Sequence, residues 1–264
     1  LFALNHTNYT TLYMAIDFRI RFGHINRAKN ILQQALKSYP NDYYFNECLA
    51  QIYSSHGNLV QATKYYKKAL TLNPDSEFLE HLLNASMCKN TNIAPRNYII
   101  KLFDEYAENF ENSLVETLSY TAHIELAKFM QQKIQIQRPI TSALDLGCGT
   151  GLCGQELIKH FKVEHLTGVD LSNNMLEHAK EKNIYHVLHN VDLVEYLRMA
   201  DTNQDLIVST DVLIYLGDLA PVFENCYRIL AHGGYFGFST EKLSRGSFKL
   251  APTGRYQHSL QHIK

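Results

Sequence analysis

The chain has 264 residues, 45% of them apolar, so it can bury a sizeable core in one large or two small domains. Its formal net charge of −1 gives no basic field of the kind that holds a nucleic-acid backbone, so we expect no nucleic-acid substrate. No stretch approaches the roughly 18 consecutive apolar residues of a membrane span. The five scattered cysteines have no paired metal-ligand spacing, which favours reduced thiols in a cytoplasmic protein.

A repeat of 34 residues dominates the N-terminal third of the chain. Four residues recur at one offset, for instance 74 − 40 = 34, with Gly23, Ala28, Ala35 and Pro40 returning as Gly57, Ala62, Ala69 and Pro74. This is the period of a helix-turn-helix tetratricopeptide unit, so residues 1–90 are predicted to form an all-α repeat domain. The lysines at 64, 67 and 68 are interpreted as a solvated helix face.

The apolar end of a stack of repeats must pack against another surface. Residues 75–89 predict one further amphipathic helix, which we interpret as a cap because no second helix of a third repeat follows. Repeats of this kind need about three units or a partner surface, so packing against the rest of the chain is expected. The domain is predicted to dock a protein partner or a protein substrate, or else to be a stabilising or homodimer-forming appendage.

Residues 91–138 are expected to form a helical linker. The polar cluster at 90–95 marks the boundary, and helices are predicted at 97–111 and 114–136. Beyond it, strands are predicted near 142–146, 165–170, 185–189, 205–210 and 234–239, and helices at 152–161, 173–182 and 219–230. This alternation predicts an α/β, doubly wound and mostly parallel sheet over 139–264, with its ligand beyond the carboxyl ends of the strands.

A glycine-rich turn follows the first predicted strand. Gly147, Gly149 and Gly151 stand at alternate positions, where backbone amides can approach a ligand that a Cβ would block. The helix predicted to begin at residue 152 would turn its N-terminus toward an anionic or polar group. The turn therefore predicts a cofactor site.

Two cofactors compete for this turn. Residues 149–154 read G-x-G-x-x-G, and Asp170 lies 170 − 149 = 21 residues on, as in the dinucleotide site of an NAD-dependent oxidoreductase. A dinucleotide-binding strand should run straight into its first glycine, yet Asp145 and Gly147 intervene to give D-x-G-x-G-x-G. That arrangement resembles motif I of the class I S-adenosylmethionine-dependent methyltransferases.

The resemblance continues along the chain. Residues 167–176, 187–192, 204–213 and 229–238 are similar to the segments around the second to fifth strands of that family. The whole chain resembles bacterial tetratricopeptide-containing predicted methyltransferases. This implies a Rossmann-like sheet, S-adenosyl-L-methionine as cofactor and S-adenosyl-L-homocysteine as product, with no metal.

The resemblance also implies roles for particular residues. The three glycines pass under the amino-acid tail and ribose, Asp145 orients the loop, and Asp170 accepts hydrogen bonds from both ribose hydroxyls. Asp192 accepts from the adenine amine, with Val191 or Leu193 beside the ring. Tyr106, in the aromatic and acidic string 103–110, is the candidate lid over the methionine end. The remaining expected cofactor contacts are Leu171, Met175 and Thr210.

The methyl acceptor is not identified by the sequence. If its nucleophile is a hydroxyl or a protonated amine a nearby base would help, and the candidates are Asp211, Tyr215, Tyr120, His123 and His258. Segment 254–259 is a candidate substrate contact, through Arg255, Tyr256 and His258. The family's sheet closes with a hairpin, but only 264 − 240 = 24 residues follow Thr240, enough for a loop and a short helix. The methyltransferase domain is therefore expected to be truncated.

Three functions follow, in order of preference. The first is methyl transfer from S-adenosylmethionine to a small molecule or protein, with the repeats docking the acceptor or a partner. The second is a non-catalytic tetratricopeptide adaptor whose second domain binds the cofactor for regulation. The third is an NAD-dependent oxidoreductase.

Overall fold

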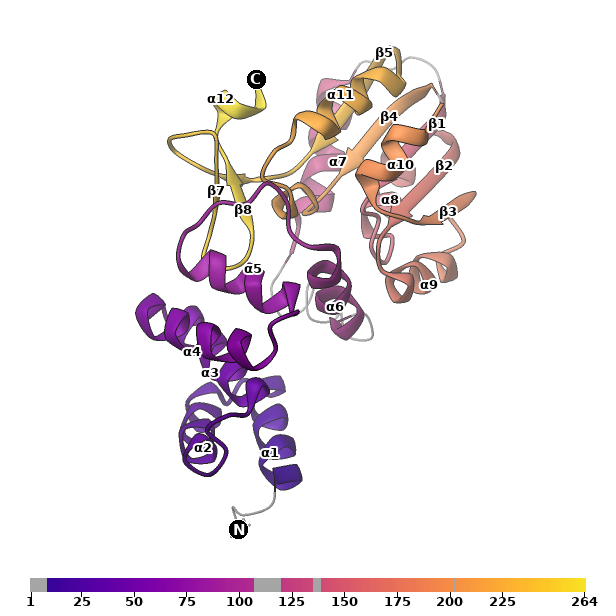
Figure 1. Ribbon diagram of the computed structural model, residues 1–264. Helices are drawn as coiled ribbons and strands as arrows, with labels where there is room; N and C mark the ends of the chain where they lie inside the picture. The colour runs from indigo at the N-terminus through magenta and orange to yellow at the C-terminus, as the bar shows by residue number, and fades with distance from the viewer. Residues whose placement is uncertain (1–8, 107–119, 135–138, 202) are drawn as a thin grey trace. The chain divides into compact units, whose positions relative to one another are not determined.

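The computed structural model describes residues 9–106, 120–134, 139–201 and 203–264, and the chain divides into two compact units (Figure 1). The repeat unit consists of Leu1–Asn90 together with Leu250–Arg255. The sheet unit consists of Thr91–Lys249 together with Tyr256–Lys264. Each unit is described by itself below.

The repeat unit is built from helices whose end points recur with the period of the sequence. They are α1 (Tyr9–Arg21), α2 (Ile25–Ser38), α3 (Tyr43–Ser55), α4 (Leu59–Leu72) and α5 (Glu77–Ser86). The ends of α1 and α3 differ by 55 − 21 = 34 residues, and those of α2 and α4 by 72 − 38 = 34. Gly23 and Gly57 end the first helix of each pair with φ values of 71° and 73°, a left-handed conformation that suits glycine. The predicted helical repeat is therefore confirmed.

The two helix pairs also bury equivalent side chains. Helix α2 buries Ala28, Leu32 and Ala35, and helix α4 buries the residues one period later, Ala62, Tyr66 and Ala69. The small alanines allow the helices to pack closely, and the larger residue between them fills the space that remains.

A segment from far along the chain completes the repeat unit, and we call Leu250–Arg255 the strap. The Ser54 hydroxyl donates a hydrogen bond to the Pro252 carbonyl at 3.1 Å. His81 Nε2 of α5 donates to the Gly254 carbonyl at 2.9 Å. The Leu250 amide donates to the Asn90 side-chain oxygen at 2.9 Å. The strap thus packs on the repeat helices next to the cap helix α5, where a third repeat would otherwise be needed.

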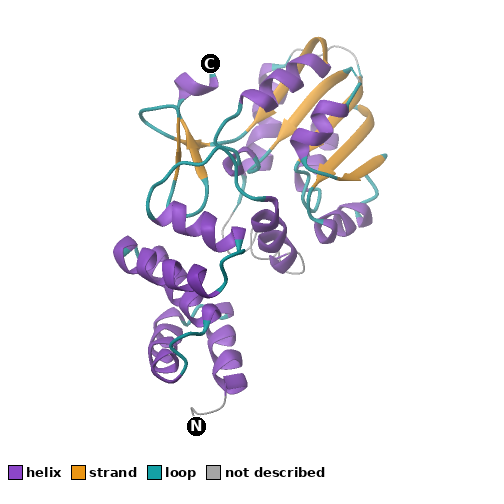
Figure 2. Cartoon of the chain, viewed as in Figure 1, coloured by secondary structure: helices purple, strands orange, loops and turns teal. Residues whose placement is uncertain are grey.

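The sheet unit contains a five-stranded parallel sheet with helices on both faces (Figures 1 and 2). Its strands are β1 (Ile140–Leu146), β2 (Val163–Asp170), β3 (Val187–Asn190), β4 (Gln204–Ser209) and β5 (Leu230–Phe238), in the order β3-β2-β1-β4-β5. The helices are α6 (Arg96–Tyr106), α7 (Ala122–Lys133), α8 (Leu152–His160), α9 (Asn173–Glu181), α10 (Leu193–Met199) and α11 (Ala220–Ile229). The doubly wound parallel sheet predicted from the sequence is confirmed.

Alternate residues of the central strands bury opposite faces of the sheet. On one face, Leu144 and Leu146 pack in a core with side chains of α10 and α11. On the other face, Ala143 packs in a core with Met130 of α7 and Leu157 of α8. Because β1 and β4 are covered on both sides, consecutive residues are buried, at 143–146 in β1 and at 204–209 in β4.

The structure differs from the sequence prediction in three places. The helix predicted over 114–136 is shorter: α7 begins at Ala122 after the non-helical residues Tyr120 and Thr121, and it ends at Lys133. Helix α10 follows β3 directly and had not been predicted, because seven residues are too few for a clear helical period. After Thr240 we expected a loop and a short helix, and the helix α12 (Leu260–Ile263) is present. It is accompanied by a small sheet of β6 (Glu241–Lys242), β7 (Phe248–Leu250) and β8 (Tyr256–His258), whose strands are too short to show alternation.

None of the helices in the described ranges is both long and apolar enough to cross a membrane.

Candidate cofactor-binding site

The glycine turn lies at the carboxyl end of β1 and adopts a backbone that only glycine takes easily. The φ values of Gly147, Gly149 and Gly151 are 68°, 53° and 92°, all in the left-handed region. The Gly147 amide donates to the Val169 carbonyl at 2.7 Å, which ties the turn to β2. A Cβ on Gly147 would lie 2.2 Å from Val212 Cγ2, whereas a Cβ on Gly149 would meet no atom within 4 Å. Packing therefore requires the first glycine, and the second borders open space.

Asp170 ends the neighbouring strand β2 and holds the same turn. Its Oδ2 accepts a hydrogen bond from the Gly149 amide at 2.8 Å, and its Oδ1 accepts from the Ser172 amide at 2.9 Å. Burial raises the pKa of this carboxyl, the bonds from the Ser172 and Gly149 amides oppose the rise, and the charge of Asp104 adds to it. Because each carboxylate oxygen has two lone pairs, both oxygens can still accept a second bond, as two ribose hydroxyls would require.

Asp104 is an acid of this site that the sequence analysis did not single out. It lies on α6, and its Oδ1 accepts a hydrogen bond from the Ser172 hydroxyl at 2.6 Å, directly beside Asp170. Its position on a helix outside the strand and turn motifs gave no signal. Tyr106, the candidate lid, is the last residue of α6, but its side chain falls outside the described residues.

Asp145 is fully buried in β1, beneath the turn. The Tyr185 hydroxyl donates a hydrogen bond to its Oδ2 at 2.7 Å. Burial raises the pKa of Asp145 to about 7, with the Tyr185 bond and the Gly154 amide opposing the rise and the Asp170 charge adding to it. A Cβ on Gly154 would lie 2.3 Å from the Tyr185 hydroxyl oxygen. Packing against Tyr185 therefore requires a glycine at position 154 as well. Tyr185 precedes β3 in a loop, and the sequence analysis missed it.

Asp192 follows β3 and has two structural partners. Its Oδ1 accepts hydrogen bonds from the Val194 and Glu195 amides at 3.0 and 3.1 Å, which caps helix α10. Its Oδ2 lies 3.4 Å from Arg96 Nε in an ion pair. Contact of the Asp192 carboxylate with adenine stays a prediction.

The remaining predicted cofactor contacts differ in exposure. Val191 and Leu193 are partly buried and pack against the core of the sheet, and Leu171 is partly buried next to Asp170. Met175 is 1% exposed in α9, which makes it a packing residue of this structure.

The carboxyl end of β4 gathers three of the five candidate bases. The Tyr120 hydroxyl hydrogen-bonds with the side chains of Thr210 and Asp211. Its ring stacks on the His123 ring, with centroids 5.2 Å apart and an interplanar angle of 19°. Burial raises the pKa of Tyr120, and the charge of Asp211 adds to the rise. The proton is therefore held on the phenol, next to the Asp211 carboxyl.

Asp211 is held in an unusual conformation. Its φ of 56° is in the left-handed region, which costs energy for a residue with a Cβ and is often found at functional sites. Its amide donates to the Ser239 hydroxyl at 2.8 Å, and that hydroxyl donates to Asp211 Oδ1 at 3.1 Å. The next residue, Val212, contacts the glycine turn at Gly147. The residue that follows Asp211 therefore packs against the predicted cofactor loop.

The other candidate base and substrate residues are buried for structural reasons. His258 is 1% exposed; its Nε2 donates to the Leu216 carbonyl at 2.8 Å, which leaves Nδ1 to accept from the Thr240 hydroxyl at 2.6 Å. Tyr256 is fully buried, and its hydroxyl hydrogen-bonds with that of Thr91. These bonds occupy the polar atoms of both side chains, which argues against direct contact with an acceptor.

Two further candidates have different environments. Tyr215 is 4% exposed and packs its ring on Tyr98 and Phe103. Arg255 is exposed and belongs to the strap of the repeat unit. Contact of segment 254–259 with a substrate stays a prediction.

Two family models match separate parts of the chain. Residues 144–236, which include the glycine turn, Asp170 and β4, match a model described as a methyltransferase domain. Residues 49–76 match a model of the tetratricopeptide repeat.

Several curated bacterial proteins share the methyltransferase part. The chain is 28% identical over 131 residues to malonyl-acyl-carrier-protein O-methyltransferase 1 of Ilyobacter polytropus, covering 46% of this chain and 47% of that protein. It is 28% identical over 139 residues to demethylmenaquinone methyltransferase of Listeria monocytogenes, covering 51% and 58%. It is 29% identical over 116 residues to ubiquinone biosynthesis O-methyltransferase of Coxiella burnetii, covering 43% and 48%. The chain thus spans about half the length of these relatives.

Two solved structures resemble the chain more distantly. The complex of DhpI with SAH is 17% identical with a TM-score of 0.47, covering 62% of this chain and 81% of that one. Phosphoethanolamine N-methyltransferase 1 of Haemonchus contortus is 18% identical with a TM-score of 0.45, covering 57% and 33%. The sequence matches and the site geometry carry the assignment. Residues 144–236 form a domain of the S-adenosylmethionine-dependent methyltransferases, and a tetratricopeptide repeat precedes it.

Proposed function

We propose that this protein is an S-adenosylmethionine-dependent methyltransferase whose repeat unit docks a partner or the acceptor. The observation that carries the proposal is the bond from the Gly149 amide to Asp170, which holds a turn of three left-handed glycines against an acid at the next strand end. The open space at Gly149 fits a cofactor that passes close over the backbone. The spare acceptor sites of Asp170 fit a ribose.

Different residues of the site would contact different parts of the cofactor. Gly147, Gly149 and Gly151 would lie under the amino-acid tail and ribose, and Asp170 would accept from the ribose hydroxyls. Asp145 would keep the turn in place through Tyr185. When bound, the cofactor supplies a methyl group activated by positive sulfur, so the protein's main tasks are alignment and exclusion of water.

Asp211 is the residue we propose to receive a proton from the acceptor. When an oxygen or nitrogen of the acceptor takes up the methyl group, its proton would pass to the Asp211 carboxylate. Ser239 and Tyr120 fix the orientation of that carboxylate, and Tyr120 keeps its own proton. The names of the relatives point to different acceptors, so the acceptor of this chain stays open.

The docking role and the cellular context are also proposals. The tetratricopeptide match supports a protein partner for the repeat unit. A homodimer would use the exposed apolar residues on and next to α1, among them Met14 and Phe18 of the helix and Phe22 just after it. All five cysteines are free thiols, which supports a reducing compartment such as the bacterial cytoplasm.

Calorimetry with S-adenosylhomocysteine tests the cofactor proposal. The protein should bind this nucleoside and not NAD, and Asp170→Asn should weaken binding by about tenfold or more, since hydrogen bonds to a charged group contribute about 1.5 to 3 kcal/mol. Asp201→Asn, at an exposed position outside the site, is the matched control and should bind normally. Normal binding by Asp170→Asn would refute the assignment.

Turnover separates an enzyme from an adaptor. With radiolabelled S-adenosylmethionine and a metabolite or lysate pool, the wild-type chain should release S-adenosylhomocysteine, and Asp211→Asn should bind it normally but release far less. Tight binding with no release from any pool would favour the non-catalytic adaptor.

A further inference from the structure

The second helix of each repeat carries positive charges and no negative ones. Helix α2 contains Arg27, Lys29 and Lys37, and helix α4 contains Lys64, Lys67 and Lys68. Neither helix has an Asp or a Glu. In a chain with a net charge of −1, this segregation creates a local basic surface on the repeat unit.

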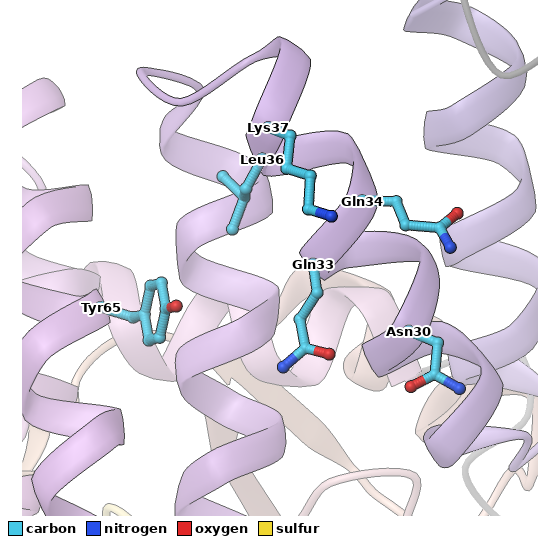
Figure 3. A pocket seen from close by; sticks show the side chains of 6 residues that line it. All are labelled: Asn30, Gln33, Gln34, Leu36, Lys37 and Tyr65. Atoms are coloured by element: carbon cyan, nitrogen blue, oxygen red, sulfur yellow. The ribbon is translucent and has the colours of Figure 1, made fainter.

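A hollow of about 470 Å³ lies on this surface (Figure 3). Its lining consists of Asn30, Gln33, Gln34, Leu36 and Lys37 from α2, with Tyr65 from α4. We call it the amide–lysine hollow. Three carboxamides in one small site can both donate and accept hydrogen bonds, which is what an extended peptide backbone requires.

One side of the hollow is fixed by a ladder of rings and cations. The Tyr53 and Tyr65 rings stack with centroids 5.7 Å apart and an interplanar angle of 9°. Lys29 Nζ lies 4.5 Å from the Tyr53 centroid, and Lys64 Nζ lies 5.6 Å from that of Tyr65. Gln33 Nε2 donates to the Tyr53 hydroxyl at 3.2 Å, which attaches the ladder to the lining. The wall is therefore formed before any ligand arrives.

These contacts revise the interpretation of the α4 lysines as a solvated face alone. Lys64 covers the ring that lines the hollow, and Lys68 lies one helical turn further along the same side of α4. Both lysines are exposed on α4, the helix that supplies Tyr65 to the lining.

We propose that the amide–lysine hollow docks an extended acidic polypeptide segment of a partner protein. The carboxamides pair with the peptide backbone, and Lys37, Lys64 and Lys68 pair with its carboxylates. This inference rests on the proposed docking role of the repeat unit and gives the partner a chemical class. Nucleic acid fits less well, because the tyrosine rings stack on each other and carry lysines, which leaves little ring surface for a base.

Fluorescence anisotropy with defined peptides tests the proposal. The probes are labelled eight-residue peptides of alternating Glu and Ser, of Gln and Ser, and of Lys and Ser, with an oligothymidine of similar length. The full chain should bind the Glu peptide most tightly, and added salt should weaken that binding. Lys37→Ala and Gln34→Ala should each weaken it about fivefold. The control Lys89→Ala, exposed on the repeat unit outside α2 and α4, should bind as the wild type does.

Three outcomes would each overturn the proposal. The first is that the Glu peptide binds no tighter than the Gln peptide. The second is that Lys37→Ala and Gln34→Ala leave the binding of the Glu peptide unchanged. The third is that oligothymidine binds more tightly than the Glu peptide and loses affinity in the same variants. Calorimetry with S-adenosylhomocysteine on the same samples keeps the two proposals apart, because the hollow variants should bind the nucleoside normally whether or not the peptide binds.

Discussion

Replacing Gly147 by alanine should destabilise the sheet unit more than the same replacement at Gly149. Both residues have left-handed φ values, 68° and 53°, so each alanine costs about 1 to 2 kcal/mol of backbone strain. At Gly147 the new Cβ would also lie 2.2 Å from Val212 Cγ2 and 2.8 Å from Cγ1, and such overpacking costs about 1 to 3 kcal/mol more. At Gly149 no atom lies within 4 Å of the new Cβ. The totals are about 2 to 5 and about 1 to 2 kcal/mol.

Val212→Ala supplies the decisive comparison. It removes both Cγ atoms that crowd the Gly147 position and leaves only Cβ, at 3.0 Å. In a double-mutant cycle measured by urea unfolding and circular dichroism, Val212→Ala should recover about 1 to 3 kcal/mol in the Gly147→Ala background. The Gly149→Ala variant should gain nothing from Val212→Ala, and should lose S-adenosylhomocysteine affinity while staying folded. Additive effects of Gly147→Ala and Val212→Ala would refute the packing explanation.

Three further predictions concern titratable groups. The pKa of Asp145 is raised from 3.8 to about 7 on folding, so its contribution to stability is complete below 3.8 and is lost as the pH rises to about 7. Between pH 5 and pH 8 the wild-type chain should therefore lose about 2 to 3 kcal/mol more than Asp145→Asn in urea unfolding, and equal losses would contradict the raised pKa. Burial lowers the pKa of His81 below 6.5, so its contribution is complete above 6.5 and is lost as the pH falls; His81→Gln should reduce the acid sensitivity of the repeat unit's melting temperature. Cys88 is the exposed cysteine, so a disulfide reagent should quickly modify about one thiol in the native chain and none in Cys88→Ser.

The main elements of the sheet unit could be predicted because each carries a strong local pattern. Strands β1 and β4 are covered on both faces and carry consecutive apolar residues, at 143–144 and at 206–208, and the glycines of the turn mark the boundary between strand and helix. The repeat helices were predictable for a related reason, since a fixed period reveals a unit that stacks on copies of itself.

Other parts of the site depend on contacts between residues far apart in sequence. Tyr185 reaches Asp145 across 40 positions, and Asp104 reaches Ser172 across 68, so no spacing rule points to either pair. The sequence analysis gave five candidate general bases and could not choose among them. Only the fold shows that Tyr120 and Asp211 lie together, while His258 is enclosed by backbone carbonyls.

The strap has a consequence for biosynthesis. His81 and Gly254 are 173 residues apart, so helix α5 acquires one of its stabilising bonds only after residue 254 has left the ribosome. Until then the surface that the strap covers is open to chaperones and to other nascent chains. Premature termination before residue 250 would therefore destabilise the repeat helices, although their own codons had been read correctly.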